Sequence, residues 1–288
     1  MIAAVHENQV RLRRYVLIAL CSALFIGCAQ VNFTASPDPN SRNRFLEQID
    51  MNGVLTWAVL PASYNSHNPT PWIVYNHGFG QTIISIVTDP PHSAFVQSLA
   101  TAGFVIVASE YRNPYCWGNT ECAEDIANLQ SLWRSKLNLS PAPFVIGESM
   151  GGIVAWNAIS RGTLKPLAVI GIYPVCNLAD MYTNNGFVPT IQSAYGFSTP
   201  SGYLAATHGF DPMIDPPSIF AGIPIQIWAS YSDRLVVRSR NADPFAKAIN
   251  AAGGSVTIHT TQGDHGDPSN FDAAAVISFF SSVLTGAP

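Results

Sequence analysis

The feature that most constrains the fold of this chain is a serine between two glycines, in the sequence G-E-S-M-G at residues 147–151. An apolar run typical of a strand, residues 143–146, leads into it, and a run typical of a helix, residues 153–159, follows it. A tight turn between a strand and a helix forces the serine into a strained backbone conformation. Side chains at the two glycine positions would collide with the crossing backbone. The sequence therefore predicts that Ser149 is a nucleophile held above the end of a strand.

A serine nucleophile needs a histidine as base, and that histidine needs an acid to orient it. His265 lies on a loop between a late expected strand and the expected terminal helix. Asp233 follows an apolar run at residues 223–230 that predicts a buried strand. We expect these two residues to act with Ser149, because both lie on loops that follow late strands.

Other histidines and acids compete for these two roles. The competing histidines are His77, His92, His208 and His259, and the competing acids are Asp180, Asp211 and Asp215. Asp180 follows an earlier strand and stays an alternative to Asp233. We expect Glu148 to pack or to form hydrogen bonds at the end of a strand, and Asp264 and Asp267 to shape their loop, rather than to react.

These parts together resemble the α/β-hydrolase superfamily of serine hydrolases, from about residue 54 to the C-terminus. The order serine, acid, histidine is the order of that fold, and the elbow is similar to those of esterases, lipases and dienelactone-hydrolase-like enzymes. A strand at residues 72–76 is followed by H-G-F-G-Q, which resembles the family's oxyanion loop. The resemblance implies backbone N–H donors at Phe79 (or Gly80) and Met150, and no metal or organic cofactor.

The expected fold class is α/β. Strands and helices alternate along the chain, which predicts a mainly parallel sheet with helices on both faces. The hydrolase domain is expected at residues 51–288. An insertion at about 174–222 interrupts the alternation and is expected to form a lid. Its many aromatic residues predict either an apolar substrate pocket or a small core of the lid itself.

The N-terminus is expected to be an export signal. A basic segment precedes an apolar run at residues 15–26, which is too short to span a bilayer comfortably, so residues 1–28 predict a signal peptide. The end of the run resembles a bacterial lipobox, in which Cys28 would be lipidated and would tether the protein to a membrane. A plain cleaved signal is the alternative. Residues 29–50 are expected to be a linker, and the protein to be secreted or anchored to the cell envelope.

The remaining cysteines agree with export. Cys116 and Cys122 flank a short loop and could form a disulfide in an oxidising compartment. Cys176 would stay unpaired, unless Cys28 is not lipidated and pairs with it. No second close pair of cysteines accompanies these two in the sequence, so a metal site is not expected.

Composition limits the function classes. Charged residues make up 11% of the chain and its net charge is −4, which argues against a nucleic-acid partner. The expected function is an exported serine hydrolase that cleaves a small-molecule or lipid carboxylic ester through an acyl-enzyme. Thioesterase, amidase and peptidase activities use the same residues and stay open, although the extra N-terminal domain typical of oligopeptidases is not expected here. A catalytically silent envelope binding protein is the alternative from a different class.

Overall fold

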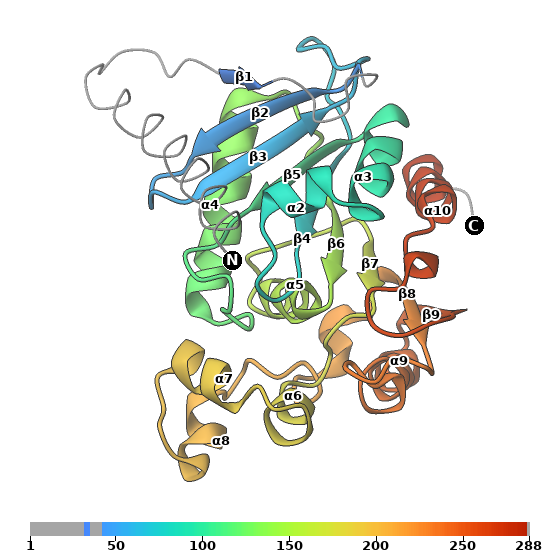
Figure 1. Cartoon of the computed structure of the whole chain (residues 1–288). Helices are drawn as coiled ribbons and strands as arrows, with labels where there is room; N and C mark the ends of the chain where they lie inside the picture. Colours follow the sequence, from blue (N-terminus) through green and yellow to red (C-terminus); the bar gives the residue numbers. More distant parts are fainter. Residues whose placement is uncertain (1–31, 35–41, 287–288) are drawn as a thin grey trace, which may run out of the picture. The chain divides into compact units, whose positions relative to one another are not determined.

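The computed structural model describes residues 32–34 and 42–286, and a nine-stranded sheet forms the centre of the described part (Figure 1). The strands are β1 Asn32–Thr34, β2 Arg44–Ile49, β3 Leu55–Leu60, β4 Trp72–Asn76, β5 Val105–Ser109, β6 Phe144–Glu148, β7 Val169–Ile172, β8 Pro224–Ser230 and β9 Ser255–Thr261. Their order in the sheet is β1-β2-β3-β5-β4-β6-β7-β8-β9. The six strands from β5 to β9 in that order are parallel, and the first three are antiparallel to their neighbours.

Helices cover both faces of this sheet. They are α2 Ile83–Thr88, α3 His92–Thr101, α4 Thr120–Lys136, α5 Met150–Ser160, α9 Ala242–Ala251 and α10 Ala273–Thr285. On one face, α2, α3 and α10 pack on the sheet in a single apolar cluster, where Phe280 stacks on Phe144 with ring centroids 4.2 Å apart. On the other face, Trp156 of α5 packs against Phe245 of α9 at 4.9 Å. The α/β class and the mainly parallel sheet predicted from the sequence are therefore confirmed.

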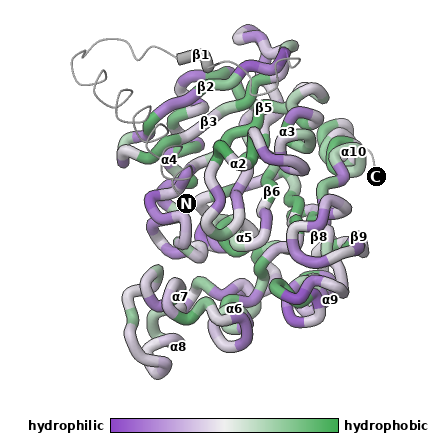
Figure 2. The backbone as a smooth tube through the Cα atoms, in the orientation of Figure 1, coloured by the Kyte–Doolittle hydropathy of each residue, from purple (hydrophilic) through white to green (hydrophobic). Residues whose placement is uncertain are grey.

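The central parallel strands are buried on both sides. All five residues of β4, of β5 and of β6 are buried, as expected for parallel strands between two helix layers. Figure 2 shows the same pattern, with hydrophobic stretches along the central strands and α10. These strands carry the site, because their carboxyl ends lie side by side, with Asn76 paired to Gly147 and Glu148 paired to Ile172.

The linker expected over residues 29–50 needs a correction, because it contains β1 Asn32–Thr34, which pairs with β2, and most of its C-terminal end is β2 itself. Arg44–Ile49 forms β2, which pairs along its whole length with β3. Phe45 and Leu46 are buried there, and Phe45 belongs to the main apolar cluster. The sequence did not indicate this strand, because its apolar run is short and follows polar residues. Its apolar side chains gain packing partners only when the sheet forms.

Residues 173–223 form the helical insertion between β7 and β8. It contains α6 Leu178–Asn184, α7 Val188–Tyr195, η1 Pro200–Gly202, α8 Tyr203–Ala206 and η2 Pro217–Phe220. Figure 1 shows α6, α7 and α8 grouped beyond one end of the sheet. We refer to this insertion as the lid.

The expected signal peptide at residues 1–28, with Cys28, lies outside the described residues. Within the described ranges, the structure has no helix that is both long and apolar enough to cross a bilayer.

Candidate active site

Ser149 lies at a sharp turn between β6 and α5. Its backbone φ is 52° and its ψ is −120°, a conformation that is costly for a residue with a side chain. The neighbouring glycines are required by close backbone contacts. A Cβ at Gly151 would lie 2.0 Å from the carbonyl oxygen of Asn76, and one at Gly147 would lie 2.8 Å from the carbonyl oxygen of Gly151. The structure therefore locates the backbone strain expected from the sequence at Ser149 itself. The tight turn holds Ser149 at the carboxyl end of the sheet.

Three side chains predicted to act together form a continuous hydrogen-bonded chain. Ser149 Oγ lies 2.9 Å from Nε2 of His265, and Nδ1 of His265 lies 2.8 Å from Oδ2 of Asp233. A carboxylate only accepts hydrogen bonds, so Nδ1 carries the proton and Nε2 is free to accept the Ser149 proton. Ser149 and Asp233 are buried, and His265 is partly exposed.

Backbone donors and an ion pair hold the two loops of this chain together. Oδ1 of Asp233 accepts hydrogen bonds from the backbone N–H groups of Leu235 and Val236, each at 2.9 Å. Asp264 pairs with the guanidinium of Arg234 and also accepts the backbone N–H of Arg234. These bonds, led by the backbone N–H of Arg234, hold the pKa of Asp264 well below its usual range. Asp264 therefore joins the acid loop to the histidine loop.

The competing residues lie in other environments. Asp180 is buried and pairs with Arg240 at 2.6 Å, while Asp211 accepts backbone N–H groups at the start of α6. His259 lies within β9 and stacks on Trp228. His77 is fully buried, and His208 lies in the lid. Asp215 also lies in the lid, beside a hollow that Ser149 does not line.

The loop after β4 places backbone N–H groups beside Ser149. The N–H of Gly80 donates to the carbonyl oxygen of Pro114 at 3.1 Å, so of the two expected positions Phe79 is the better donor. Gly78 is close enough that a Cβ there would lie 3.3 Å from Cβ of Ser149. Met150 follows Ser149 as the first residue of α5, where helix N–H groups have no partner within the helix.

Solved structures resemble this chain, whereas no protein-family model and no curated protein matches it. An acylaminoacyl peptidase from Pyrococcus horikoshii superposes with a TM-score of 0.67 at 16% identity, over 88% of this chain and 42% of that one. TT1662 from Thermus thermophilus gives 0.60 at 14% identity, over 89% of this chain and 99% of that one. Brefeldin A esterase, described as a bacterial homologue of human hormone sensitive lipase, gives 0.56 at 20% identity, over 92% and 78%.

The chain has the α/β-hydrolase fold. It spans 42% of the length of the acylaminoacyl peptidase, so the likeness concerns one part of that protein. In this fold a nucleophile elbow is a sharp turn between a strand and a helix, and Ser149 lies at a turn of that geometry.

A pocket of about 210 Å³ opens over Ser149 and His265 in this α/β-hydrolase fold. Its apolar lining is formed by Phe79, Trp117, Val175, Met181, Phe187, Leu235 and Val236. A larger hollow of about 620 Å³ lies beside α4 and is lined by none of the residues of the hydrogen-bonded chain. We therefore take the smaller pocket as the candidate substrate site. Within the described residues, no group of three His, Cys, Asp or Glu side chains is placed to hold a metal ion.

Three aromatic residues, Phe79, Trp117 and Phe187, form one wall of this pocket, and Tyr115 packs against Phe79. The ring of Phe79 lies 4.6 Å from Tyr115, 5.5 Å from Trp117 and 5.1 Å from Phe187. Phe187 and Met181 come from the lid. Other lid aromatics pack among themselves, as Tyr182 stacks on Tyr203 at 4.6 Å. Some lid residues, such as Phe187, therefore line the substrate pocket, while others, such as Tyr182 and Tyr203, form a small core of the lid itself.

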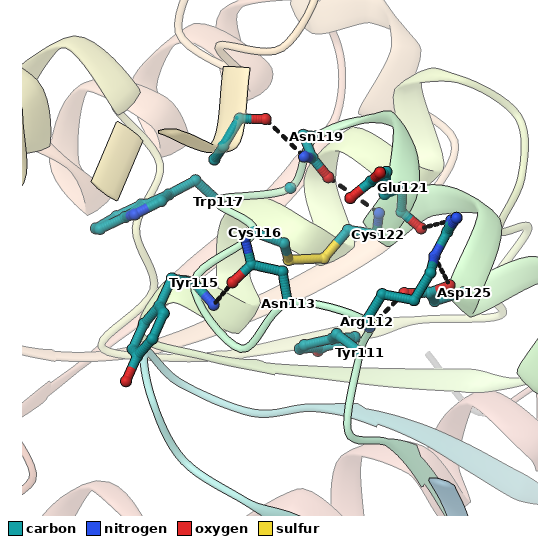
Figure 3. The surroundings of a disulfide bond; sticks show 12 residues. Tyr111, Arg112, Asn113, Tyr115, Cys116, Trp117, Asn119, Glu121, Cys122 and Asp125 are labelled. Atoms are coloured by element: carbon teal, nitrogen blue, oxygen red, sulfur yellow. Dashed lines mark hydrogen bonds and ion pairs between the residues drawn. A yellow bond between two sulfur atoms is a disulfide. The ribbon is translucent and has the colours of Figure 1, made fainter. Parts of the chain in front are cut away.

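The predicted disulfide between Cys116 and Cys122 is present, and Cys116 directly precedes Trp117 of this wall. Trp117 and Arg112 extend on opposite sides of it (Figure 3). The indole N–H of Trp117 donates to Thr190 of α7 at 3.1 Å, so the disulfide loop is bonded to the lid. Cys176 is a free, buried thiol.

Glu148 and His92 form a hydrogen-bonded polar pair in the lining of the pocket. Glu148 was expected to make hydrogen bonds at a strand end, and its Oε1 accepts Nε2–H of His92 at 2.9 Å. Both residues line the pocket. No sequence signal linked them, because 55 residues separate them and only the sheet brings the start of α3 to the end of β6.

Proposed function

We propose that the protein is a serine hydrolase that cleaves carboxylic esters, with Ser149 as nucleophile, His265 as base and Asp233 as the acid that orients it. The observation that carries the proposal is the unbroken chain of hydrogen bonds from Asp233 through His265 to Ser149 at the floor of an apolar pocket. Among the rivals, Asp180 pairs with Arg240, Asp211 accepts backbone N–H groups of α6, and His92 pairs with Glu148. This arrangement satisfies the geometric requirement for a nucleophile, its base and an orienting group.

The reaction follows from this geometry. His265 Nε2 takes the Ser149 proton as Oγ attacks the ester carbonyl, and Asp233 stabilises the resulting imidazolium. The C–O bond to the alcohol then breaks as His265 returns the proton to the leaving oxygen. Water, activated by the same histidine, hydrolyses the acyl-enzyme and restores Ser149.

The negative charge on the tetrahedral intermediate needs fixed donors. The backbone N–H groups of Phe79 and Met150 are the candidates, since Met150 directly follows Ser149, Phe79 directly follows Gly78, which lies against Ser149, and the N–H of Gly80 is already engaged. A single donor of this kind contributes roughly 3–4 kcal/mol to the transition state.

The pocket supports a small, uncharged group on the substrate. A volume of about 210 Å³ lies below the roughly 300–1,000 Å³ of pockets for drug-sized ligands. Among the described residues that line it, the one carboxylate is Glu148, whose oxygens accept from four donors and therefore cannot hold the amino terminus of a peptide. Short-chain esters therefore fit better than long acyl chains or free amino-terminal peptides.

Amide hydrolysis is the second candidate, because two of the similar solved structures are described as an acylaminoacyl peptidase and a puromycin hydrolase. Thioesters would use the same residues. Matched ester, thioester and anilide substrates with one acyl group separate these activities, and the ester proposal predicts the highest kcat/KM for the ester relative to its uncatalysed rate.

The test of the main proposal is turnover of p-nitrophenyl esters from acetate to palmitate by the full chain. Ser149→Ala should abolish turnover, and wild type should favour acetate and butyrate over palmitate. Ser160→Ala is the matched control, since Ser160 ends α5 and its hydroxyl donates to the carbonyl oxygen of Asn157 within that helix. Unchanged turnover in folded Ser149→Ala would refute the proposal.

We also propose that the protein is exported and lipidated at Cys28. The disulfide between Cys116 and Cys122 supports an oxidising compartment. Mass spectrometry of the protein from a bacterial host should find an N-terminal Cys28 carrying acyl chains in the membrane fraction. Cys28→Ala should release the protein from that fraction, and an unprocessed N-terminus in wild type would contradict the proposal.

A further inference from the structure

Glu148 is a buried carboxylate with an unusual number of hydrogen-bond donors around it. Its Oε1 accepts from Tyr173 Oη at 2.7 Å, from Gln81 Nε2 at 2.9 Å and from His92 Nε2 at 2.9 Å. Its Oε2 accepts from Tyr75 Oη at 2.6 Å. These five residues come from five different segments, and we call them the Glu148 network. A buried charge is costly unless it is fully paired in this way.

One branch of the network reaches the loop that carries Phe79. Gln81 donates to Glu148 through Nε2, and its Oε1 accepts the backbone N–H of Gly78 at 2.6 Å. Gly78 lies directly against Ser149 and precedes Phe79 in the chain. Glu148 therefore fixes the amide plane of Gln81, and Gln81 fixes the start of the oxyanion loop.

A second branch reaches the base. Tyr173 donates its hydroxyl proton to Glu148, and its ring packs edge-on against the imidazole of His265 with centroids 4.4 Å apart. Tyr173 has a positive φ of 33°, a strained conformation that needs its surroundings to hold it. The hydrogen bond to Glu148 is one of the contacts that hold the ring behind His265.

The third branch supplies positive charge. Burial by itself lowers the pKa of His92, but the hydrogen bond and charge of Glu148 raise this pKa overall, with a smaller contribution from Asp89. Burial by itself raises the pKa of Glu148, but His92, Tyr75 and Tyr173 hold it below its usual value. The two shifts agree on a charged pair. The ring of Phe271 packs edge-on against the imidazole of His92, with centroids 4.7 Å apart.

We propose that Glu148, held by His92, is a positioning residue that sets the oxyanion loop through Gln81 and the base through Tyr173. The inference rests on the proposed function, because it concerns the donor at Phe79 and the base His265. A carboxylate one residue before the nucleophile is rigidly placed by the same strained turn that places Ser149. It can therefore hold the donor loop and the base in fixed positions relative to the nucleophile.

The test uses Gln81→Met, which keeps the length of a half-buried side chain but removes its hydrogen bonds to Glu148 and to Gly78. The expected result is a fall in kcat on p-nitrophenyl acetate of about tenfold, smaller than the roughly 10²–10³-fold loss on removal of a donor, with little change in KM. Amide hydrogen exchange of Gly78 should become faster. The matched control is Gln130→Met, since Gln130 is also half-buried with two hydrogen bonds, to Ile126 and Thr163, but lies on α4.

A second pair of variants tests the charged branch. His92→Phe removes the donor to Glu148 and should lower kcat, whereas His92→Gln keeps a donor and should lower it less. Loss of thermal stability without a loss of kcat in His92→Phe and in Gln81→Met would mean that the network is only structural, and would overturn the proposal. A change confined to KM would also overturn it.

Failure of the proposed function is distinguishable from failure of this inference. If wild type shows no turnover that depends on Ser149, the proposed function fails, and the exchange of Gly78 alone decides the positioning role. Faster exchange in Gln81→Met than in Gln130→Met then supports it, and equal exchange overturns it.

Discussion

Asp233→Asn is the substitution for which the structure predicts the sharpest loss of activity. The backbone N–H groups of Leu235 and Val236 both donate to Oδ1 of Asp233. An asparagine must place its carbonyl oxygen there, because its amide nitrogen cannot accept these two bonds. The NH₂ group is then directed at Nδ1 of His265, where Oδ2 lies now.

This orientation forces the wrong tautomer on His265. The NH₂ group can only donate to Nδ1, so the imidazole proton moves to Nε2, which faces Ser149 at 2.9 Å. A protonated Nε2 donates to Ser149 and cannot take its proton. The same change in serine proteases lowers kcat about 10⁴-fold, which is about 5 kcal/mol in the activation free energy.

The assay is kcat on p-nitrophenyl acetate between pH 6 and 9, with thermal denaturation as a check on folding. Asp180→Asn is the control, because Asp180 is the buried rival acid and pairs with Arg240 instead. It should lose stability but keep its kcat. If Asp233→Asn kept kcat within about tenfold of wild type, or if Asp180→Asn showed the larger loss of kcat, the assignment of the acid would be wrong.

Three further predictions concern stability. Gly151→Ala should prevent correct folding or lower Tm strongly, because its Cβ would overlap a backbone oxygen at 2.0 Å. Replacing Cys116 and Cys122 together by alanine should lower the free energy of unfolding by about 2 kcal/mol, from the entropy of the short loop, and should raise KM by loosening the wall at Trp117. The Tm advantage of wild type over His92→Gln should be greatest between the ordinary pKa values of 4.5 for Glu148 and 6.5 for His92. The raised pKa of His92 contributes stability that is lost as the pH rises through it, and the lowered pKa of Glu148 contributes stability that is lost as the pH falls through it.

Denaturation scans and steady-state kinetics decide these three predictions. A normal Tm for Gly151→Ala would mean that the backbone can move away from the elbow. An unchanged KM in the cysteine double variant would mean that the disulfide does not shape the substrate pocket. A Tm difference for His92→Gln that is constant from pH 5 to pH 9 would contradict the charged pair.

The sequence predicts the alternation of strands and helices and the residues that meet around Ser149. Both can be predicted because they depend on local sequence patterns. The glycines around Ser149 indicate a tight turn. The loops that follow late strands place Asp233 and His265 at the same edge of the sheet. Strand β2 could not be predicted in this way. Its two buried residues, Phe45 and Leu46, form too short a run to stand out from the polar segment before them.

Long-range polar contacts were also beyond local patterns. Glu148 could be assigned a hydrogen-bonding role at a strand end, but its partners depend on which strands are neighbours. Tyr75 reaches it from β4 and Tyr173 from the turn after β7, on either side of β6. The choice of Phe79 over Gly80 as a donor likewise depends on Pro114, which only the folded chain brings to that loop.

The most direct test of the account is peptide mapping of the wild-type full chain after reaction with a fluorophosphonate probe. The account predicts one adduct per molecule, on the peptide that contains Ser149, and slower labelling in Asp233→Asn. An adduct on another residue, or no adduct on protein that is shown to be folded, would contradict the claim that Ser149 is an activated nucleophile.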